Sequence, residues 1–202
     1  PIYQMTARGL LGLPQKAFIV GYVGRLHMMG IDKGVGTLVQ AMQQVDDALL
    51  LLVGGPDDMA ERLRASWIAS CAEPERFIYM SAVPPSTVPL VLATLDVGVI
   101  PLPDVPEYAY YNSPLKLFEY MAAGLAIVAS DLPSLWDVLR HDENALLYPA
   151  GDVVALADAL KRLRDDGEWT VYLQQTAYDD SWQYTWARRA QRILEAIEAL
   201  KP

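Results

Sequence analysis

The chain has 202 residues, of which 52% are hydrophobic and 20% charged, and its 16 Lys and Arg against 25 Asp and Glu give a net charge of −9. This composition supplies enough apolar residues for a full core and excludes an intrinsically disordered chain. The length corresponds to one large domain or two very small ones. Because the acidic balance repels phosphodiester backbones and no Lys- or Arg-rich run is present, we expect no nucleic-acid partner.

The single cysteine, Cys71, leaves no disulfide framework and no cysteine metal site, which favours a cytoplasmic location. We expect Cys71 to be a small buried hydrophobic residue in a helix rather than a nucleophile. The longest apolar runs have the length of strands and fall well short of the roughly twenty residues of a membrane helix.

Residues 1–17 have the character of a linker. The chain begins Pro1-Ile2-Tyr3 without an initiator Met and runs through a polar, Gly-containing stretch to the first apolar run. We therefore expect residues 1–17 to be a linker remnant and the chain to be a fragment of a longer protein.

Residues 18–166 alternate between strand-like and helix-like patterns. Six nearly continuous apolar runs are typical of strands covered on both faces: Phe18 to Val23, Ala48 to Gly54, Arg76 to Ser81, Asp96 to Leu102, Leu125 to Ser130 and Ala145 to Tyr148. Helical patterns lie between or after them, at residues 35–45, 57–71, 86–95, 113–123, 132–140 and 152–164. This alternation predicts an α/β fold with a Rossmann-like, doubly wound parallel sheet, whose ligands bind at the carboxyl ends of the strands.

Residues 167–202 contain no further strand pattern and form a C-terminal helical segment. Its apolar face lies opposite a row of charged residues and comprises Trp182, Trp186, Ala190, Ile193, Leu194, Ile197 and Leu200. We expect this face to pack on the domain's own helices. The alternative is that part of it meets a missing partner domain.

The loop after the first predicted strand brings two cations to the start of a helix. Gly24 and Arg25 follow the strand, and Lys33 precedes Gly34, which opens the helix. Backbone N–H groups and the helix dipole favour an anion there, and Arg25 with Lys33 could neutralise a diphosphate. The alternative is a glycine turn flanked by two solvated cations, because the dinucleotide fingerprint G-x-G-x-x-G is absent.

A second helix start suited to an anion is predicted at Ser113 and Pro114. Ser113 is a good N-cap residue and Pro114 a good first helical residue. Free N–H groups of Leu115 and Lys116 should therefore point out beyond the strand that ends near residue 101.

Glu119 lies in the second turn of this predicted helix, among mostly apolar residues. We expect it to be half-buried and to have a partner. A hydroxyl pair, such as a ribose 2′,3′-diol, is one candidate partner. A salt bridge to Lys116 or Lys33 is an equally good one.

Taken together, these segments resemble the C-terminal, donor-binding domain of retaining glycosyltransferases of the GT-B architecture, in glycosyltransferase family four. The resemblance covers nearly the whole chain. It rests on markers that stand in order: Gly24-Arg25-Leu26 with Lys33-Gly34, Leu52 to Pro56, Arg76 to Pro84, Ala93 to Val97, Ser113 to Gly124 and Ile127 to Asp131.

The resemblance implies that Arg25 and Lys33 bind the donor diphosphate and that Glu119 binds the ribose, and these three are the expected catalytic residues. The donor would be a UDP-, GDP- or ADP-linked sugar. No cofactor or metal is implied, since cations and helix N-termini would stabilise the departing diphosphate. The other donor-binding residues by resemblance are Gly24, Val83 (beside the nucleobase), Tyr111, Asn112, Ser113, Pro114, Leu115 and Lys116.

The sequence departs from the family pattern in two places. Tyr111 stands eight residues before Glu119, where the family has the first Glu of its Glu-x7-Glu motif. Glu107 is a possible substitute, although a solvated Glu107 is the stronger alternative. The loop between Arg25 and Lys33 is also longer, with Met28-Met29-Gly30 inserted, and either covers the diphosphate or packs on neighbouring hydrophobic residues.

The resemblance also implies that a separate N-terminal domain holds the acceptor and any membrane attachment. Half a cleft gives up most of the positioning of the two reactants, so we expect the chain alone to transfer little or no sugar. The alternatives are a non-catalytic nucleotide- or partner-binding module on the same scaffold and a sugar-nucleotide epimerase of related fold.

Overall fold

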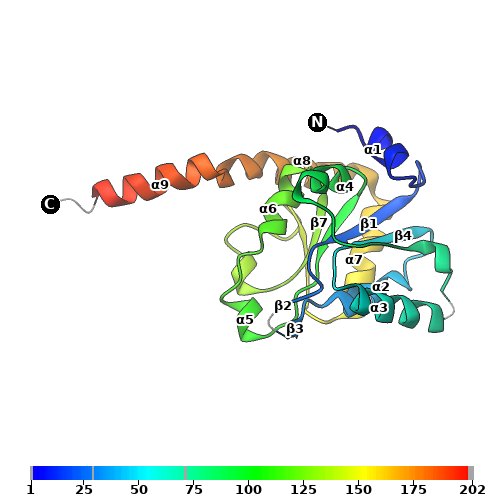
Figure 1. Ribbon diagram of the computed structural model, residues 1–202. Helices are drawn as coiled ribbons and strands as arrows, with labels where there is room; N and C mark the ends of the chain where they lie inside the picture. The colour runs from blue at the N-terminus through cyan, green and yellow to red at the C-terminus, as the bar shows by residue number, and fades with distance from the viewer. Residues whose placement is uncertain (1, 29, 71, 200–202) are drawn as a thin grey trace.

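The computed structural model describes residues 2–28, 30–70 and 72–199, and its centre is a six-stranded parallel sheet (Figure 1). The strands follow the order β5-β4-β1-β6-β7-β8. They are β1 (Phe18–Val23), β4 (Ala48–Val53), β5 (Phe77–Met80), β6 (Val97–Ile100), β7 (Ala126–Ser130) and β8 (Leu146–Tyr148). The expectations for Cys71, Met29 and Leu200 lie outside the described residues.

Helices cover both faces of the sheet, because successive strand residues point to opposite sides. In β1, Val20 and Tyr22 belong to one core cluster, whereas Ile19 and Val23 belong to the other. The first cluster includes α2 (Val35–Met42), α3 (Asp57–Ala69) and α7 (Val153–Asp165), the second includes α4 (Val88–Leu92) and α6 (Leu115–Ala122), and α8 (Gly167–Ser181) contributes to both. The predicted Rossmann-like, doubly wound sheet is confirmed.

The segment expected to be a linker contains helix α1 (Gln4–Leu10), which Arg8 fixes to the body of the domain. The buried Arg8 guanidinium donates to three backbone carbonyl oxygens at 2.9–3.0 Å and to the Asp96 carboxylate at 2.8 Å. Residues 4–10 are therefore a docked helix. The sequence of this segment resembles a linker, because local composition does not reveal its partners Thr94 and Asp96, which lie far along the chain.

The prediction of a helix at residues 132–140 is wrong, since this segment forms the 3-10 turn η3 (Pro133–Leu135) and a loop. The buried Asn144 side chain accepts from the N–H of Arg140 at 2.8 Å and donates to the carbonyl oxygen of Val138 at 3.0 Å. These bonds satisfy backbone groups that a helix would otherwise pair.

The other short elements are α5 (Pro106–Ala109), η1 (Pro74–Arg76), η2 (Pro85–Thr87) and η4 (Trp182–Tyr184).

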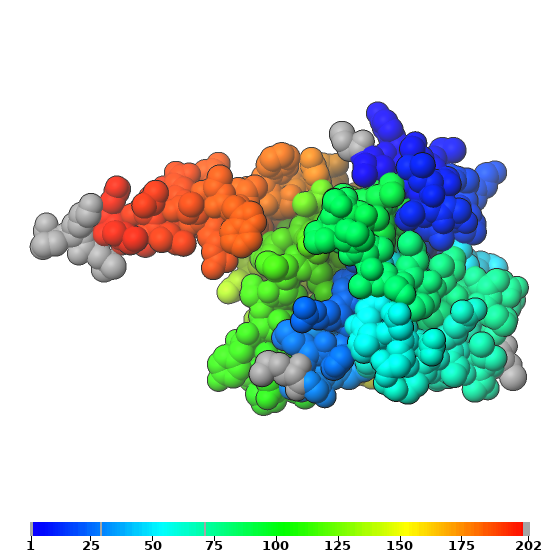
Figure 2. Space-filling view, viewed as in Figure 1, coloured from blue at the N-terminus to red at the C-terminus, as the bar shows by residue number. Residues whose placement is uncertain are grey.

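The C-terminal helix α9 (Trp186–Ala199) projects from the body as an arm (Figures 1 and 2). None of its described residues is buried, and Trp186 and Leu194 are 74% and 61% exposed. The expectation that its apolar face packs on the domain's own helices is wrong, because α9 turns away after η4.

Among the described residues, no helix has the length and apolar character needed to cross a membrane.

Candidate functional site

The site lies at the carboxyl ends of β1 and β6, where the strand order reverses direction. In a doubly wound sheet this switch point opens a crevice for ligands. Two glycines allow the loops to meet there. Gly34, with φ of 74°, begins α2 so close to the end of β6 that a Cβ would overlap the carbonyl oxygen of Pro101, and a Cβ on Gly54 would overlap that of Gly24. The start of α2 is therefore held directly over the crevice.

The long loop between Arg25 and Lys33 is a small antiparallel hairpin rather than an irregular loop. It consists of β2 (His27–Met28) and β3 (Ile31–Asp32). The N–H of Lys33 donates to the carbonyl oxygen of Leu26 at 3.0 Å, which closes the base of the hairpin. The Tyr108 hydroxyl donates to the Ile31 carbonyl oxygen at 3.3 Å and ties the hairpin to α5. The hairpin thus returns the chain so that Lys33 stands beside the end of β1.

Arg25 and Lys33 lie close enough to each other for their charges to interact. Arg25 is exposed, whereas Lys33 is partly buried. Burial, and secondarily the Arg25 guanidinium, lower the pKa of Lys33. An anion bound between them would relieve this repulsion. The alternative of two fully solvated cations therefore does not describe Lys33.

Helix α6 begins one residue later than predicted. Pro114 is its N-cap residue, with extended backbone, and no side chain makes a capping hydrogen bond, so Ser113 does not cap the helix. The reason is that Pro114 itself has extended backbone, with φ of −72° and ψ of 114°, so helical geometry begins only at Leu115. The N–H groups of Leu115 and Lys116 still lie in the first turn, where an α-helix offers no partner.

The Lys116 side chain reaches under the end of β1. Its Nζ atom lies 3.5 Å from the centre of the Tyr22 ring, and a Cβ on Gly24 would lie 3.1 Å from it. Nζ is buried and has no hydrogen-bond partner in the described structure. Burial and the nearby Lys33 hold the pKa of Lys116 well below its usual range, while Glu119 acts in the opposite direction.

The sequence predicts a backbone contact of Lys116 with the donor and offers its side chain only as a salt-bridge partner of Glu119, so the buried side chain is the functional candidate that sequence reasoning missed. A lysine in the first turn of a mostly apolar helix was the available signal. Arg25, Lys33 and Lys116 together are called the cation cluster below.

Glu119 is exposed, contrary to the expectation of half-burial. Among the described residues it has no ion pair or side-chain hydrogen bond, so the predicted salt bridge to Lys116 or Lys33 is also wrong. Glu119 is exposed because its place on α6 turns it toward an open hollow of about 800 Å³, which Phe118 and Trp182 also line. Its carboxylate is free to accept hydrogen bonds from a ligand.

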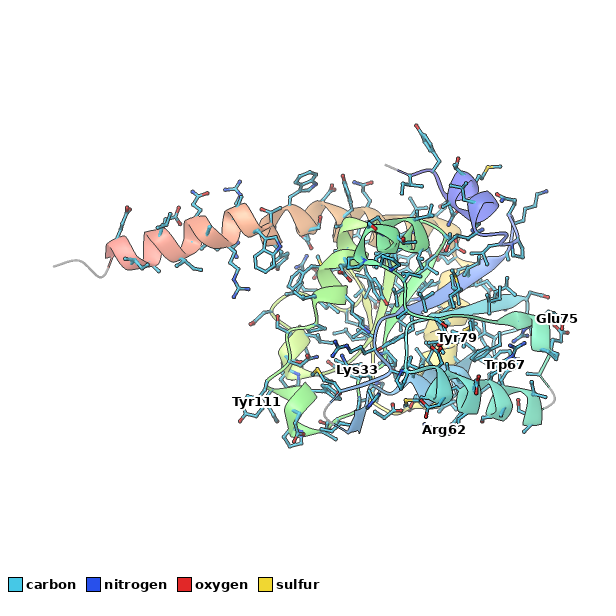
Figure 3. All side chains as sticks on the ribbon, in the orientation of Figure 1. Lys33, Arg62, Trp67, Glu75, Tyr79 and Tyr111 are labelled. Carbon is cyan, nitrogen blue, oxygen red and sulfur yellow. The ribbon has the colours of Figure 1, made fainter. Side chains whose placement is uncertain are left out.

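The remaining candidates lie around the rim. Tyr111 is 85% exposed, makes an edge contact with Tyr110 at 6.5 Å between ring centres, and lies at the outer edge of the body in Figure 3, with Lys33 further in. Val83 is partly buried after β5, Asn112 is partly buried, and Glu107 is exposed. In the described part of the chain, no three His, Cys, Asp or Glu side chains gather as a metal site would require.

Comparison with known proteins gives concordant matches. The sequence model of the family described as "Glycosyl transferases group 1" matches residues 17–166. The phosphatidyl-myo-inositol mannosyltransferase of Mycobacterium leprae is 31% identical over 96% of this chain and 50% of its own length. The chain spans about half the length of the relatives it matches, and the matched part is their C-terminal half.

Solved structures with the same fold include the sucrose-phosphate synthase of Thermosynechococcus elongatus, with a TM-score of 0.80 and 29% identity over 98% of this chain and 49% of that one. The Anabaena protein HepE, solved in complex with UDP and glucose, has a TM-score of 0.80 and 22% identity over 97% of this chain and 52% of that one. The fold matches the C-terminal domains of GT-B glycosyltransferases.

Proposed function

Because the chain belongs to the family of group 1 glycosyl transferases, as its ordered motifs predicted, we propose that it is the donor-binding part of an enzyme that transfers a sugar from a nucleoside diphosphate sugar. The observation that carries this proposal is the cation cluster. A protein with a net charge of −9 places Arg25, Lys33 and Lys116 where two helix N-termini meet the carboxyl edge of a parallel sheet. This arrangement suits a diphosphate.

In the proposed complex, Arg25 and Lys33 bind the diphosphate and stabilise its charge as the bond to the sugar breaks. Glu119 accepts hydrogen bonds from the ribose hydroxyls, and Val83 packs against the base. The N–H groups of Leu115 and Lys116 complete the phosphate site. We propose that transfer proceeds with retention of configuration and without a metal or cofactor.

The acceptor is proposed to come from a separate N-terminal domain, which would also carry any membrane attachment. The exposed apolar face of α9 is available to meet such a domain. The isolated chain should then bind donor but transfer little sugar, because one side of the cleft cannot hold both reactants. A cytoplasmic location would give the enzyme access to nucleotide sugars.

A thermal-shift titration with UDP, GDP and ADP tests the donor site, with UDP first because HepE was solved with it. We expect one of the three to raise the unfolding midpoint of the wild-type protein. Glu119→Ala should bind that nucleotide about tenfold to a hundredfold more weakly, because hydrogen bonds to a charged group are worth about 1.5–3 kcal/mol. Glu198→Ala, on the exposed arm, is the matched control and should bind like wild type. Equal binding by Glu119→Ala would contradict the ribose assignment.

Tyr111 favours one second function, a non-catalytic nucleotide- or partner-binding module. It places an exposed ring where the family has a carboxylate. Sugar transfer by the intact protein distinguishes the two. Unchanged transfer after Lys33→Ala with Glu119→Ala would support the module, whereas loss of transfer supports the enzyme.

A further inference from the structure

The Lys116 ammonium is an unpaired polar group in the interior of the candidate site. Its neighbours are engaged elsewhere, since the Tyr22 hydroxyl donates to the Arg25 carbonyl oxygen at 2.6 Å and the Tyr120 hydroxyl accepts from the Val23 N–H at 3.0 Å. The face of the Tyr22 ring, 3.5 Å away, attracts the cation, and Glu119 attracts it without forming an ion pair. A buried charge with so little compensation is costly to the free protein.

The buried ammonium lies beside Gly24, a residue without a side chain. Gly24 has φ of 140°, and a Cβ there would lie 3.1 Å from Nζ. Because Gly24 has no side chain, a ligand that approaches its backbone meets no Cβ beside Nζ, and a small movement of the ammonium would bring it within the length of a charge-assisted hydrogen bond. Gly24 also follows β1 directly, at the switch point where a doubly wound sheet binds its ligand.

The titratable groups around Lys116 do not neutralise its charge. From the hairpin side the neighbour is Lys33, a second cation, and from α6 it is Glu119, which is exposed. Tyr22 and Tyr120 are buried phenols whose pKa burial raises, so both stay neutral. Within the described residues, no carboxylate forms an ion pair with Lys116.

We propose that the Lys116 side chain is a ligand of the donor diphosphate, binding a phosphate oxygen that approaches beside Gly24, in addition to Arg25 and Lys33. The inference rests on the proposed function and deepens it. Lys116 is the most buried member of the cation cluster, and in this proposal its ammonium gains a hydrogen-bond partner only when the donor binds.

Two consequences separate this role from a structural one. A bound dianion raises the pKa of Lys116 from its lowered value, so binding takes up a proton at pH values between the two, and affinity falls as pH rises through that window. Removal of the charge should also leave the free protein at least as stable, because the unpaired ammonium destabilises the native state below its unfolded pKa. A structural lysine would show neither effect.

The test measures binding of UDP, GDP and ADP, and of the matching nucleosides, by calorimetry to wild type and Lys116→Met. We expect nucleoside diphosphate affinity to fall by about tenfold to a hundredfold in Lys116→Met, as for loss of one charge-assisted hydrogen bond. Nucleoside affinity should be unchanged and the unfolding midpoint not lowered. Lys116→Gln repeats the test should the Met variant fold poorly. Lys16→Met, an exposed lysine before β1, is the control and should bind like wild type.

Each outcome is decisive. Proton uptake, measured in two buffers of different ionisation enthalpy, should be smaller in Lys116→Met than in wild type. Equal diphosphate affinity in the two proteins, or equal proton uptake, would overturn the Lys116 assignment and leave the donor site standing. Wild-type protein that binds none of the three diphosphates would overturn the proposed function and this inference together.

Discussion

Replacing Gly34 by alanine should destabilise the fold by about 3–5 kcal/mol and abolish nucleotide binding, because two penalties coincide at this position. The φ of 74° is strained for an L-residue, and the added Cβ would overlap the carbonyl oxygen of Pro101. The overlapping atom belongs to backbone at the end of β6, so relief requires α2 to move off the crevice. Lys33, the preceding residue, would move with it.

Gly36→Ala is the matched control for this prediction, two residues further along. Gly36 lies within α2, and a Cβ there would meet no atom within 4 Å. Alanine at that position should be neutral or stabilise by up to about 1 kcal/mol through helix propensity. Chemical denaturation of both variants and titration with nucleoside diphosphates measure the two effects. A Gly34→Ala protein as stable as Gly36→Ala would show that the contact between α2 and Pro101 does not constrain the site.

The sheet could be predicted because its strands are buried on both faces and carry that burial as continuous apolar runs. Phe18–Val23 was predicted with the bounds that the structure shows, and Ala48–Val53 ends one residue earlier than expected. Alternation with amphipathic helices then leaves few topologies for a parallel sheet. This reasoning depends only on local patterns, which a single sequence contains.

The elements that the sequence misrepresented depend on distant partners. Helix α1 is short and polar, and its order comes from Arg8 bonding to Thr94 and Asp96. Residues 132–140 have helical spacing, yet Asn144 takes over their backbone bonds. Helix α9 has an amphipathic pattern like that of a packed helix, but the pattern does not say which surface covers it.

The candidate site was predictable in its residue types and less so in its geometry. Spacing placed Arg25 and Lys33 on one loop and Glu119 in the second turn of a helix, and the resemblance gave all three a role in donor binding. Neither could show that Glu119 faces solvent while Lys116, three residues earlier, points beneath β1. That orientation depends on how α6 lies against Tyr22 and Gly24, which is a tertiary property.

Arg8 gives the second large expected effect, at the end of the sheet opposite the cation cluster. Its side chain is 3% exposed and forms four hydrogen bonds, one of them in the ion pair with Asp96. Asp96 is still supported without it, by the N–H of Ile19 at 2.7 Å and the amide of Gln4 at 3.0 Å. The greater loss is therefore at the carbonyl oxygens that Arg8 leaves unpaired, Thr94 among them.

Arg8→Met should lower the free energy of unfolding by about 3–5 kcal/mol, because three carbonyl oxygens lose their donor at about 1–3 kcal/mol each. Arg62→Met breaks the ion pair of Arg62 with Asp58, whose side chains are 70% and 65% exposed, and should cost less than about 1 kcal/mol. Denaturant titration of both variants measures the difference. Because Arg8 lies far from the crevice, the folded Arg8→Met protein should bind nucleoside diphosphate as tightly as wild type. Weakened binding at full folding would mean that α1 supports the donor site through β6, and equal stability of the two variants would mean that the contacts of Arg8 do not hold α1 in place.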